Sequence, residues 1–255
     1  MPKTLIEVEH LVAHYGDLLV LDDVSVSLQQ GEIFVVIGGS GCGKTTLLKH
    51  MTGLLHPTSG AIRYSGEDIT SMDEDRLARL QQGIGIAFQS GGLFNSMTVG
   101  ENVALPLREY GDVDDDLIDG IVRLKLSLVG LAHAQHMMPS ELSGGMAKRA
   151  GLARAIALDP PVVYFDEPSA GLDPIMASGL DDLIRNLNKL LGITFIIVTH
   201  ELDSIRKIAD RIVMLHRGKV VFAGTVEEAE TTDEERVRQF FERRADEFIM
   251  QQSAQ

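Results

Sequence analysis

Three short apolar runs stand out along the chain and predict the central strands of a parallel sheet. They are IFVVI at 33–37, VVYF at 162–165 and TFIIV at 194–198, and all three are rich in β-branched residues. A run without polar alternation suits a strand that other elements cover on both faces. Each run has a helical pattern before or after it, so the sequence predicts an α/β core.

The pattern near the N-terminus differs, because apolar and polar positions alternate there. Residues 6–11 and 24–28 follow this alternation, which is typical of strands with one exposed face. Residues 212–224 predict a hairpin that turns near Arg217 and Gly218. A helix with one apolar stripe is expected after the first apolar run. The stripe consists of Leu47, Leu48, Met51, Leu54 and Leu55.

The β-branched runs disappear between about 90 and 157, where helical patterns dominate. This predicts a helical lobe inserted into the α/β core, and the acidic run at 112–116 is interpreted as a solvated loop or a helix start. From Val226 onward the chain is charged and helical. We expect this tail to dock on its own chain or on an identical copy through one apolar face. That face consists of Val237, Phe240, Phe241 and Phe248.

Composition narrows the class of protein. The 255 residues are 44% apolar, which suits one large α/β domain or two closely packed lobes. No apolar run approaches the ~20 residues that a membrane span needs. The first ten residues carry acids and lack an apolar signal core, so secretion is not expected. A single cysteine fits a reducing compartment, and a net charge of −14 argues against nucleic acid as a partner.

The segment 38–45, GGSGCGKT, lies between a predicted strand and a predicted helix and satisfies the phosphate-loop pattern G-x-x-x-x-G-K-[ST]. Glycines let the backbone wrap around phosphates and point N–H groups inward. Lys44 would supply charge to the outer phosphates, Thr45 a hydroxyl ligand for Mg²⁺, and Cys42 a small filler at a free position. The predicted ATP-binding residues here are Gly38, Gly39, Ser40, Gly41, Cys42, Gly43, Lys44, Thr45 and Thr46.

Two adjacent acids, Asp166 and Glu167, end the apolar run of VVYFDEP. Neighbouring carboxylates repel each other unless a cation relieves them, so Asp166 is expected to partner Mg²⁺. Glu167 is then placed to act as the general base on a water molecule, an effect typically worth ~10²–10⁴ in rate. Two acids on a solvated loop are the alternative, which the phosphate loop disfavours.

A Ser-Gly-Gly triplet opens an alanine-rich helical stretch at LSGGM, 142–146. Glycine costs a helix roughly 1 kcal/mol against alanine, so two glycines require a reason. Together with Gln89, the LDP at 172–174 and His200, this stretch makes the chain resemble an ATP-binding-cassette (ABC) ATPase over residues 5 to 225.

The resemblance implies a homodimer that closes head to tail around two ATP molecules. Ser143, Gly144 and Gly145 of one copy would cap the γ-phosphate bound by the phosphate loop of the other. Free N–H groups and the positive dipole end of a helix favour an anion, and glycines allow its close approach. A serine N-cap alone would explain Ser143 but not both glycines.

Other positions are carried over from the family one by one. Tyr15 matches the aromatic that stacks on adenine, although it could be a surface tyrosine. Gln89 matches the residue that touches Mg²⁺ and links the lobes. Residues 169–173 match the loop by which the two copies sense each other. His200 matches the histidine that contacts the γ-phosphate and orients the catalytic water, whereas His133 reads as a surface residue, as does His136.

The family also implies an architecture: a P-loop NTPase with a RecA-like parallel-sheet core, an N-terminal antiparallel β subdomain and an inserted helical subdomain. Residues 1–255 would form a single ABC ATPase domain. Its catalytic core would combine 1–89 and 158–225, its helical signature subdomain would span 90–157, and 226–255 would form a C-terminal helical extension.

Met146 and the stretch 88–107 resemble the ATPases of mammalian-cell-entry (MCE) type, which include the maintenance-of-lipid-asymmetry transporters. This implies lipid transport by a peripheral subunit on the cytoplasmic side of the inner membrane, bound to multi-spanning permease subunits and, through them, to an MCE-domain protein. Residues 91–101 would receive a permease helix, unless their apolar side chains are buried in the helical lobe. The tail would reach across to the other copy.

Two other functions remain open at this point. One is an importer ATPase for a small solute such as an amino acid or an ion, which would share every catalytic residue. The other is an ABC ATPase of an iron–sulfur assembly machine, which needs no permease. A regulatory binder without hydrolysis is disfavoured because Lys44, Asp166, Glu167 and His200 are all present.

Overall fold

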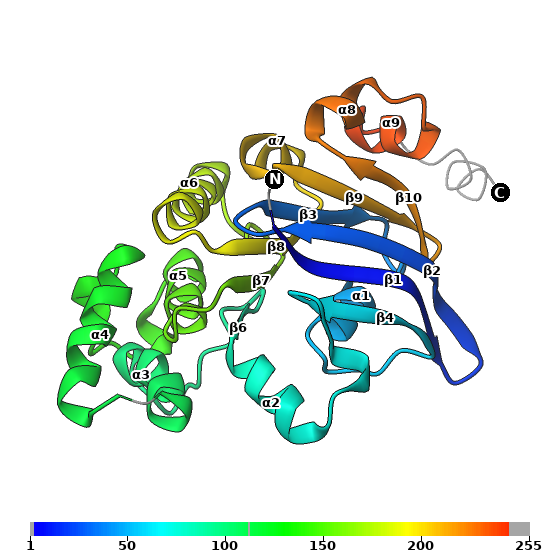
Figure 1. The fold of residues 1–255 in the computed structure, drawn as a ribbon. Helices are drawn as coiled ribbons and strands as arrows, with labels where there is room; N and C mark the ends of the chain where they lie inside the picture. Colours follow the sequence, from blue (N-terminus) through cyan, green and yellow to red (C-terminus); the bar gives the residue numbers. More distant parts are fainter. Residues whose placement is uncertain (1–2, 112, 245–255) are drawn as a thin grey trace.

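Two β-sheets and a cluster of helices make up the computed structural model, which describes residues 3–111 and 113–244 (Figure 1). The central sheet has the strand order β10-β9-β3-β8-β7-β6, with β10 antiparallel to β9 and the other neighbours parallel. Every residue of β3 and β8 is buried, which confirms the prediction from the apolar runs. These strands are β3 (Ile33–Gly38), β6 (Ile84–Ala87), β7 (Val162–Asp166), β8 (Thr194–Val198), β9 (Arg211–His216) and β10 (Lys219–Gly224).

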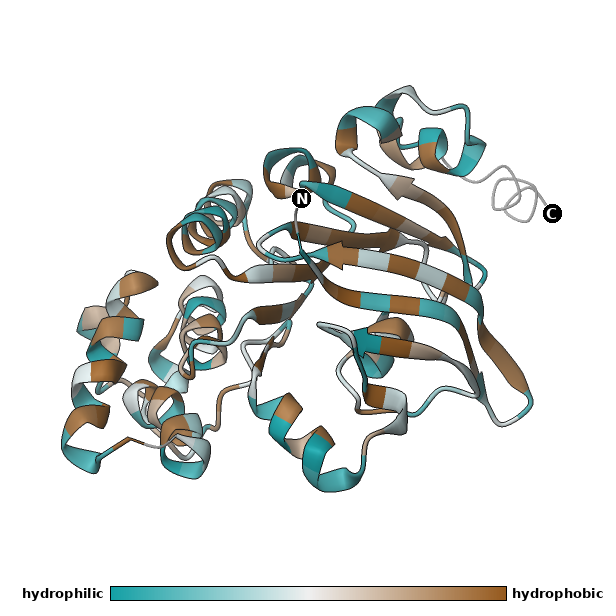
Figure 2. Cartoon of the chain, viewed as in Figure 1, coloured by the Kyte–Doolittle hydropathy of each residue, from teal (hydrophilic) through white to brown (hydrophobic). Residues whose placement is uncertain are grey.

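A second, antiparallel sheet with the order β2-β1-β4-β5 confirms the predicted N-terminal β subdomain. Apolar and polar bands alternate along β1 and β2 in Figure 2, because one face of each strand packs inward. Side chains of β3 divide between two cores: Phe34 and Val36 join the cluster beneath this sheet, whereas Val35 and Ile37 join the cluster on the other face. The strands are β1 (Thr4–Tyr15), β2 (Leu18–Gln29), β4 (Ser59–Tyr64) and β5 (Glu67–Asp68).

The inserted helical lobe also matches the prediction, and Figure 1 places it beside β6 and β7. It contains α3 (Val99–Tyr110), α4 (Asp115–Leu128) and α5 (Gly144–Ala155), with the short 3₁₀ turns η2 (Ala132–Ala134) and η3 (Pro139–Glu141) between α4 and α5. The acidic run supplies the N-cap of α4, Asp114, and two residues of its first turn, Asp115 and Asp116. Carboxylates there stabilise the helix, because its N-terminus carries the positive end of the helix dipole.

The apolar stripe predicted at 47–55 is partly wrong. Helix α1 (Lys44–Met51) ends before Leu54, which is 59% exposed, and before Leu55. Gly53 causes this, because its φ of +71° leaves the right-handed helical region and closes the helix. The other helices of the core are α2 (Glu74–Gln82), α6 (Pro174–Leu191) and α7 (Leu202–Ile208), with η1 (Ile69–Ser71).

The tail docks on its own chain within the described residues, as one of the two predicted alternatives. It forms α8 (Val226–Thr231) and α9 (Glu235–Phe241), and Val237 and Phe241 are buried against the core. The Arg206 guanidinium of α7 lies 5.8 Å from the Phe241 ring centroid and pairs with Glu230. Phe248, the fourth residue of the predicted face, lies outside the described residues.

Candidate nucleotide-binding site

The phosphate loop connects β3 to α1, and its backbone conformation depends on glycine at two positions. Gly38 has φ +145°, and a Cβ there would lie 2.3 Å from the Leu215 carbonyl oxygen. Gly43 is the N-cap of α1 with φ +107°, and a Cβ there would lie 2.6 Å from Leu21 Cδ2. Both positions are therefore closed to larger residues by their own chain.

The opposite side of the loop is open. Gly39, Ser40, Gly41 and Thr45 are exposed, and a Cβ at either of these glycines would meet nothing within 4 Å. Lys44 Nζ donates to the carbonyl oxygens of Gly38 at 2.8 Å and Gly39 at 3.0 Å, which holds its charge against the loop. The start of α1 thus presents N–H groups and a cation to the same open space, an arrangement suited to phosphate.

The predicted carboxylate pair lies at the carboxyl end of β7. Burial raises the pKa of Asp166, the charge of Glu167 raises it further, and Lys44 opposes both. Glu167 has φ +47°, and its N–H donates to the Val198 carbonyl oxygen at 2.8 Å. Asp166, whose favourable charged neighbour is Lys44, could hold a hard cation such as Mg²⁺, with the Thr45 hydroxyl available as a further oxygen ligand.

His200, directly after β8 and Thr199, approaches the carboxylate pair. Its Nδ1 lies 2.9 Å from Glu167 Oε1, and its Nε2 lies 3.4 Å from Glu201 Oε1. The other oxygen of Glu167, Oε2, is buried and has no hydrogen-bond partner within the described part of the chain. A buried carboxylate oxygen without a donor is costly in isolation, so it marks a place where a ligand or water would bind.

These groups meet because β3, β7 and β8 are adjacent parallel strands whose carboxyl ends share one edge of the sheet. Gln89 follows β6 by two residues at the same edge and is exposed. Tyr15 ends β1 in the antiparallel sheet with 48% of its surface exposed. The structure therefore brings the phosphate loop, Asp166, Glu167 and His200 together, and Tyr15 is exposed on the antiparallel sheet.

The Ser-Gly-Gly triplet lies elsewhere. Ser143 is the N-cap of α5, and its Oγ accepts from the Met146 N–H at 3.3 Å. In Figure 1 the helical lobe with α5 is well separated from α1. Ser143 and Gly144 are exposed, and a Cβ on Gly144 would meet nothing closer than Leu172 Cδ2 at 3.9 Å. Contacts within the chain thus do not explain why position 144 is glycine.

Lys148, one turn further along α5, belongs to the site but was not singled out in the sequence. Its Nζ donates to the carbonyl oxygens of Glu167 at 3.2 Å, Pro168 at 2.6 Å and Ala170 at 2.6 Å. The alanine-rich sequence of α5 has no clear apolar face that could have revealed it, although a buried charge of this kind needs partners.

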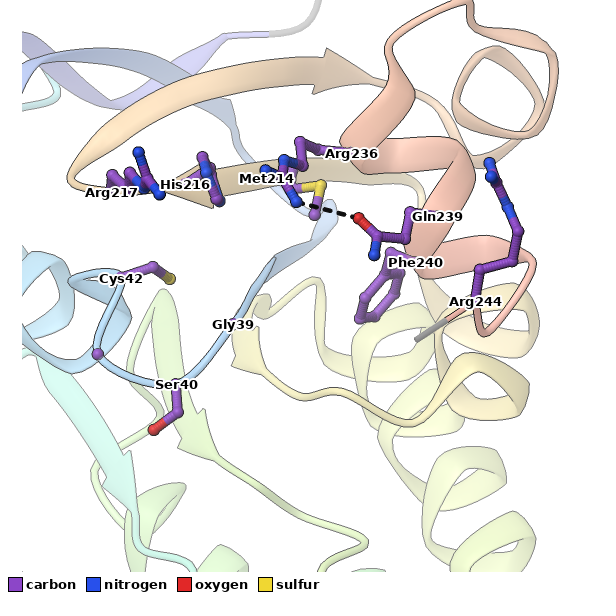
Figure 3. A pocket seen from close by; sticks show the side chains of 11 residues that line it. Gly39, Ser40, Cys42, Met214, His216, Arg217, Arg236, Gln239, Phe240 and Arg244 are labelled. Atoms are coloured by element: carbon purple, nitrogen blue, oxygen red, sulfur yellow. Dashed lines mark hydrogen bonds between the residues drawn. The ribbon is translucent and has the colours of Figure 1, made fainter. Parts of the chain in front are cut away.

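A cavity of about 550 Å³ borders the phosphate loop on its β9 side (Figure 3). Its lining includes residues 39–42 of the loop and Phe240 and Arg244 of the tail, and the Arg236 guanidinium donates to Gln239 Oε1 at 3.1 Å. Asp166, Glu167 and His200 do not line this cavity. The tail therefore flanks the loop on the side away from the carboxylates.

Comparison with known proteins agrees with this geometry. The family model described as ABC transporter matches residues 21–170. The chain is 42% identical over 246 residues to the "Intermembrane phospholipid transport system ATP-binding protein MlaF" of Haemophilus influenzae, covering 96% of this chain and 93% of that protein. It is 42% identical over 235 residues to the "Probable ribonucleotide transport ATP-binding protein mkl" of Mycobacterium tuberculosis, covering 92% and 66% respectively.

Among solved structures, the ATP-binding cassette MJ0796 superposes with a TM-score of 0.79 at 28% sequence identity, covering 87% of this chain and 99% of that one. That structure is a dimer in a post-hydrolysis state bound to ADP and Pi. Within residues 3–111 and 113–244, no helix combines the length and apolarity that crossing a membrane requires.

Proposed function

This chain belongs to the ABC transporter family, and we propose that within the family it drives the transport of phospholipids or related lipids. Family membership makes it an ATP-hydrolysing subunit coupled to transport. The observation that carries the lipid proposal is the similarity, along nearly the whole chain, to a protein named for intermembrane phospholipid transport. Met146 and the 88–107 stretch support the same cargo.

In the proposed mechanism, Lys44 and the start of α1 neutralise the charge of the outer phosphates. His200 holds one oxygen of Glu167, and the unpartnered Oε2 accepts the proton of the attacking water. Thr45, Gln89 and Asp166 would hold Mg²⁺, which supplies further positive charge to the phosphate oxygens when bound. Tyr15 stacks on the adenine and fixes the orientation of the nucleotide.

The cassette acts as a head-to-tail homodimer in this proposal. Ser143 and Gly144 at the start of α5 are exposed and Gly145 is buried, and the helical lobe that carries α5 lies apart from α1 in Figure 1. The exposed start of α5 is therefore available to the nucleotide of a second copy. The dimeric ADP-bound and Pi-bound relative supports this arrangement. Closure on ATP and opening after hydrolysis then shift the conformation of the membrane subunits.

A surface near the junction of the two lobes is proposed to receive the permease. Leu54, Phe88 and Phe94 each expose more than half of their surface, although large apolar side chains usually bury theirs. Leu93 packs against the core of the helical lobe instead. For residues 91–101 we expected either docking of a permease helix or burial of the apolar side chains in the helical lobe. The exposed Phe94 supports docking, and the packed Leu93 supports burial.

The test is purification of the tagged chain from its native membranes in mild detergent, with mass spectrometry of co-purifying proteins and lipids. Multi-spanning permease subunits, an MCE-domain protein and bound phospholipid are the expected result. A permease with a solute-binding protein would assign a small-solute or ribonucleotide cargo instead, and only soluble partners would indicate an assembly ATPase. A Phe88→Glu, Phe94→Glu double variant is expected to lose the permease, whereas Leu117→Glu on the exposed face of α4 is the matched control.

A further inference from the structure

Lys148 joins two functional segments that act on different nucleotides in the proposed dimer. The residue lies on α5, which begins with the Ser-Gly-Gly triplet, and it is only 5% exposed. Its three carbonyl acceptors all belong to residues 167–170, the segment that carries Glu167. An ammonium group has three donors, so these contacts use its full hydrogen-bonding capacity.

The contact is not an ordinary feature of helix packing. Burial lowers the pKa of Lys148, and the charge of Glu167 partly offsets this. A methionine of similar shape would fill the same space without burying a charge, so packing alone does not favour a lysine here. The three carbonyl oxygens lie within one short turn, and a single ammonium group satisfies them together.

The hydrogen bonds from Lys148 restrain the backbone of Glu167, which has an unusual conformation. A glutamate with φ +47° is in a conformation that L-residues avoid, and it persists only where its surroundings impose it. Its N–H is held by the Val198 carbonyl on β8, and its carbonyl is held by Lys148 on α5. The backbone of Glu167 is therefore clamped between the central sheet and the helical lobe.

We propose that Lys148 is a positioning residue that couples the two ATP sites of the dimer: it transmits the position of the start of α5, set by the nucleotide of the other copy, to Glu167 of its own site. The inference rests on the dimer of the proposed function, because Ser143, Gly144 and Gly145 contact a nucleotide only in that arrangement. A rotation or shift of α5 on closure moves the three acceptor carbonyls through Lys148, and with them the backbone that carries the Glu167 carboxylate.

The experiment compares the dependence of ATP hydrolysis on ATP concentration for three variants of the full chain. Lys148→Met removes the donors and keeps the volume, and Lys148→Arg keeps donors. Lys125→Met is the matched control, since Lys125 is 3% exposed and pairs with Asp159 away from the nucleotide site. Thermal unfolding of each variant checks that it folds.

We expect the wild-type chain to show a Hill coefficient above 1. Lys148→Met is expected to bring it to 1 and to lower kcat about 10- to 100-fold, the scale of a misplaced catalytic group, with little change in the affinity of the isolated chain for ATP. Lys148→Arg is expected to retain part of the cooperativity. Lys125→Met is expected to alter thermal stability and leave cooperativity intact. If Lys148→Met matches Lys125→Met in kcat and Hill coefficient, the coupling role is overturned.

Failure of the dimer itself is read separately, from size-exclusion chromatography of Glu167→Gln with ATP. A variant that stays monomeric there would remove the head-to-tail dimer of the proposed function, which is the premise of the coupling role. A variant that dimerises, together with unchanged kinetics for Lys148→Met, would overturn the coupling proposal alone.

Discussion

Helices α1 and α5 both begin next to a glycine, and their beginnings differ in what surrounds them. At α1 the N-cap is Gly43 in a left-handed conformation that the neighbouring Leu21 side chain closes to larger residues. At α5 the N-cap is Ser143, and the next residue, Gly144, has open space where a side chain would project. Contacts within the chain explain Gly43, and they also explain the buried Gly145, whose added Cβ would lie 2.7 Å from Met176 Cε. They do not explain Gly144, and the contrast between the two helix starts lies at that position.

The comparison shows that a helix start can bind phosphate in two settings, one assembled by its own chain and one completed by a second copy. A helix start offers unpaired N–H groups and a positive dipole end in both places. Around α1 the same chain adds Lys44, Asp166, Glu167 and His200, so nearly a whole site is assembled. At α5 the first residues of the start, Ser143 and Gly144, are exposed, and we expect their partner to come from a second copy. Four predictions test this division.

The largest effect is expected at the α1 site, from Glu167→Gln. Removing the general base while keeping its size is expected to lower turnover by about 10²–10⁴-fold and to leave ATP binding intact. The measurements are steady-state hydrolysis and equilibrium binding of ATP on the same preparation. Turnover near the wild-type value would refute the assignment of Glu167 as the base.

Ser143→Arg is expected to have the next largest effect, and it tests the α5 start. A long cation at this exposed cap blocks close approach of a second copy, so turnover is expected to fall by about 10²-fold or more, as when one donor to a developing charge is lost. ATP affinity of the isolated chain is expected to stay unchanged. Mixing Ser143→Arg with Lys44→Ala is expected to restore some activity, because one intact composite site can then form.

Persistent activity in Ser143→Arg would mean that the α5 start does not complete the site. Loss of ATP binding by the isolated chain would mean that the two helix starts are not independent within one copy.

The α1 site was predictable because each part is a short motif at the end of an apolar run. Three such runs are followed by residues 38–45, by Asp166 and Glu167, and by His200. The runs form parallel strands of one sheet, so their carboxyl ends lie at the same edge. Local pattern and a single topological rule were therefore enough. The half-exposed strands near the N-terminus and the hairpin at Arg217 were predictable for a similar reason, since alternation and turn residues are local signals. The antiparallel pairing of the N-terminal strands came from the family resemblance.

What the sequence could not predict depends on contacts between distant segments. The stripe beyond Met51 failed because Gly53 turns the chain out of the helix, and the same glycine packs against Leu77 of α2. The role of Lys148 depends on three carbonyl oxygens about twenty residues away, whose convergence follows from the backbone of the 167–170 turn. The alanine-rich sequence of α5 has no clear apolar face, so it does not show that Lys148 is buried or which groups it contacts.

Tyr15→Ala tests whether one copy binds ATP through its own phosphate loop and Tyr15, without the α5 start. Stacking of a base on an aromatic ring is worth about 1–3 kcal/mol, so ATP affinity of the isolated chain is expected to fall about 10-fold or more. Affinity for inorganic triphosphate, which lacks the base, is expected to remain. Tyr110→Ala is the control, since Tyr110 is another exposed tyrosine, on α3 in the helical lobe. Equal losses in both variants would contradict the stacking role.

Gly144→Ala is expected to have the smallest effect and the one most specific to the α5 start. Alanine fits this position in the isolated chain, because Gly144 has no positive φ and its Cβ would meet nothing closer than 3.9 Å. The substitution is expected to stabilise the folded chain by up to about 0.5–1 kcal/mol, since glycine weakens a helix. Turnover is nevertheless expected to fall about 10-fold, because a methyl group at the start of α5 obstructs the close approach of phosphate that the glycine permits.

Gly120→Ala separates these two effects. Gly120 lies inside α4 with nothing within 4 Å of its added Cβ, so its substitution is expected to give a similar gain in stability. Because α4 does not reach a nucleotide in the proposed dimer, hydrolysis is expected to stay at the wild-type rate. The expected result is a higher melting temperature for both variants and slower hydrolysis for Gly144→Ala alone. It would mean that position 144 must be glycine because a partner outside the chain approaches it. If Gly144→Ala hydrolyses ATP at the wild-type rate, no close approach of a partner requires glycine at this position. The contrast between the two helix starts would then be wrong.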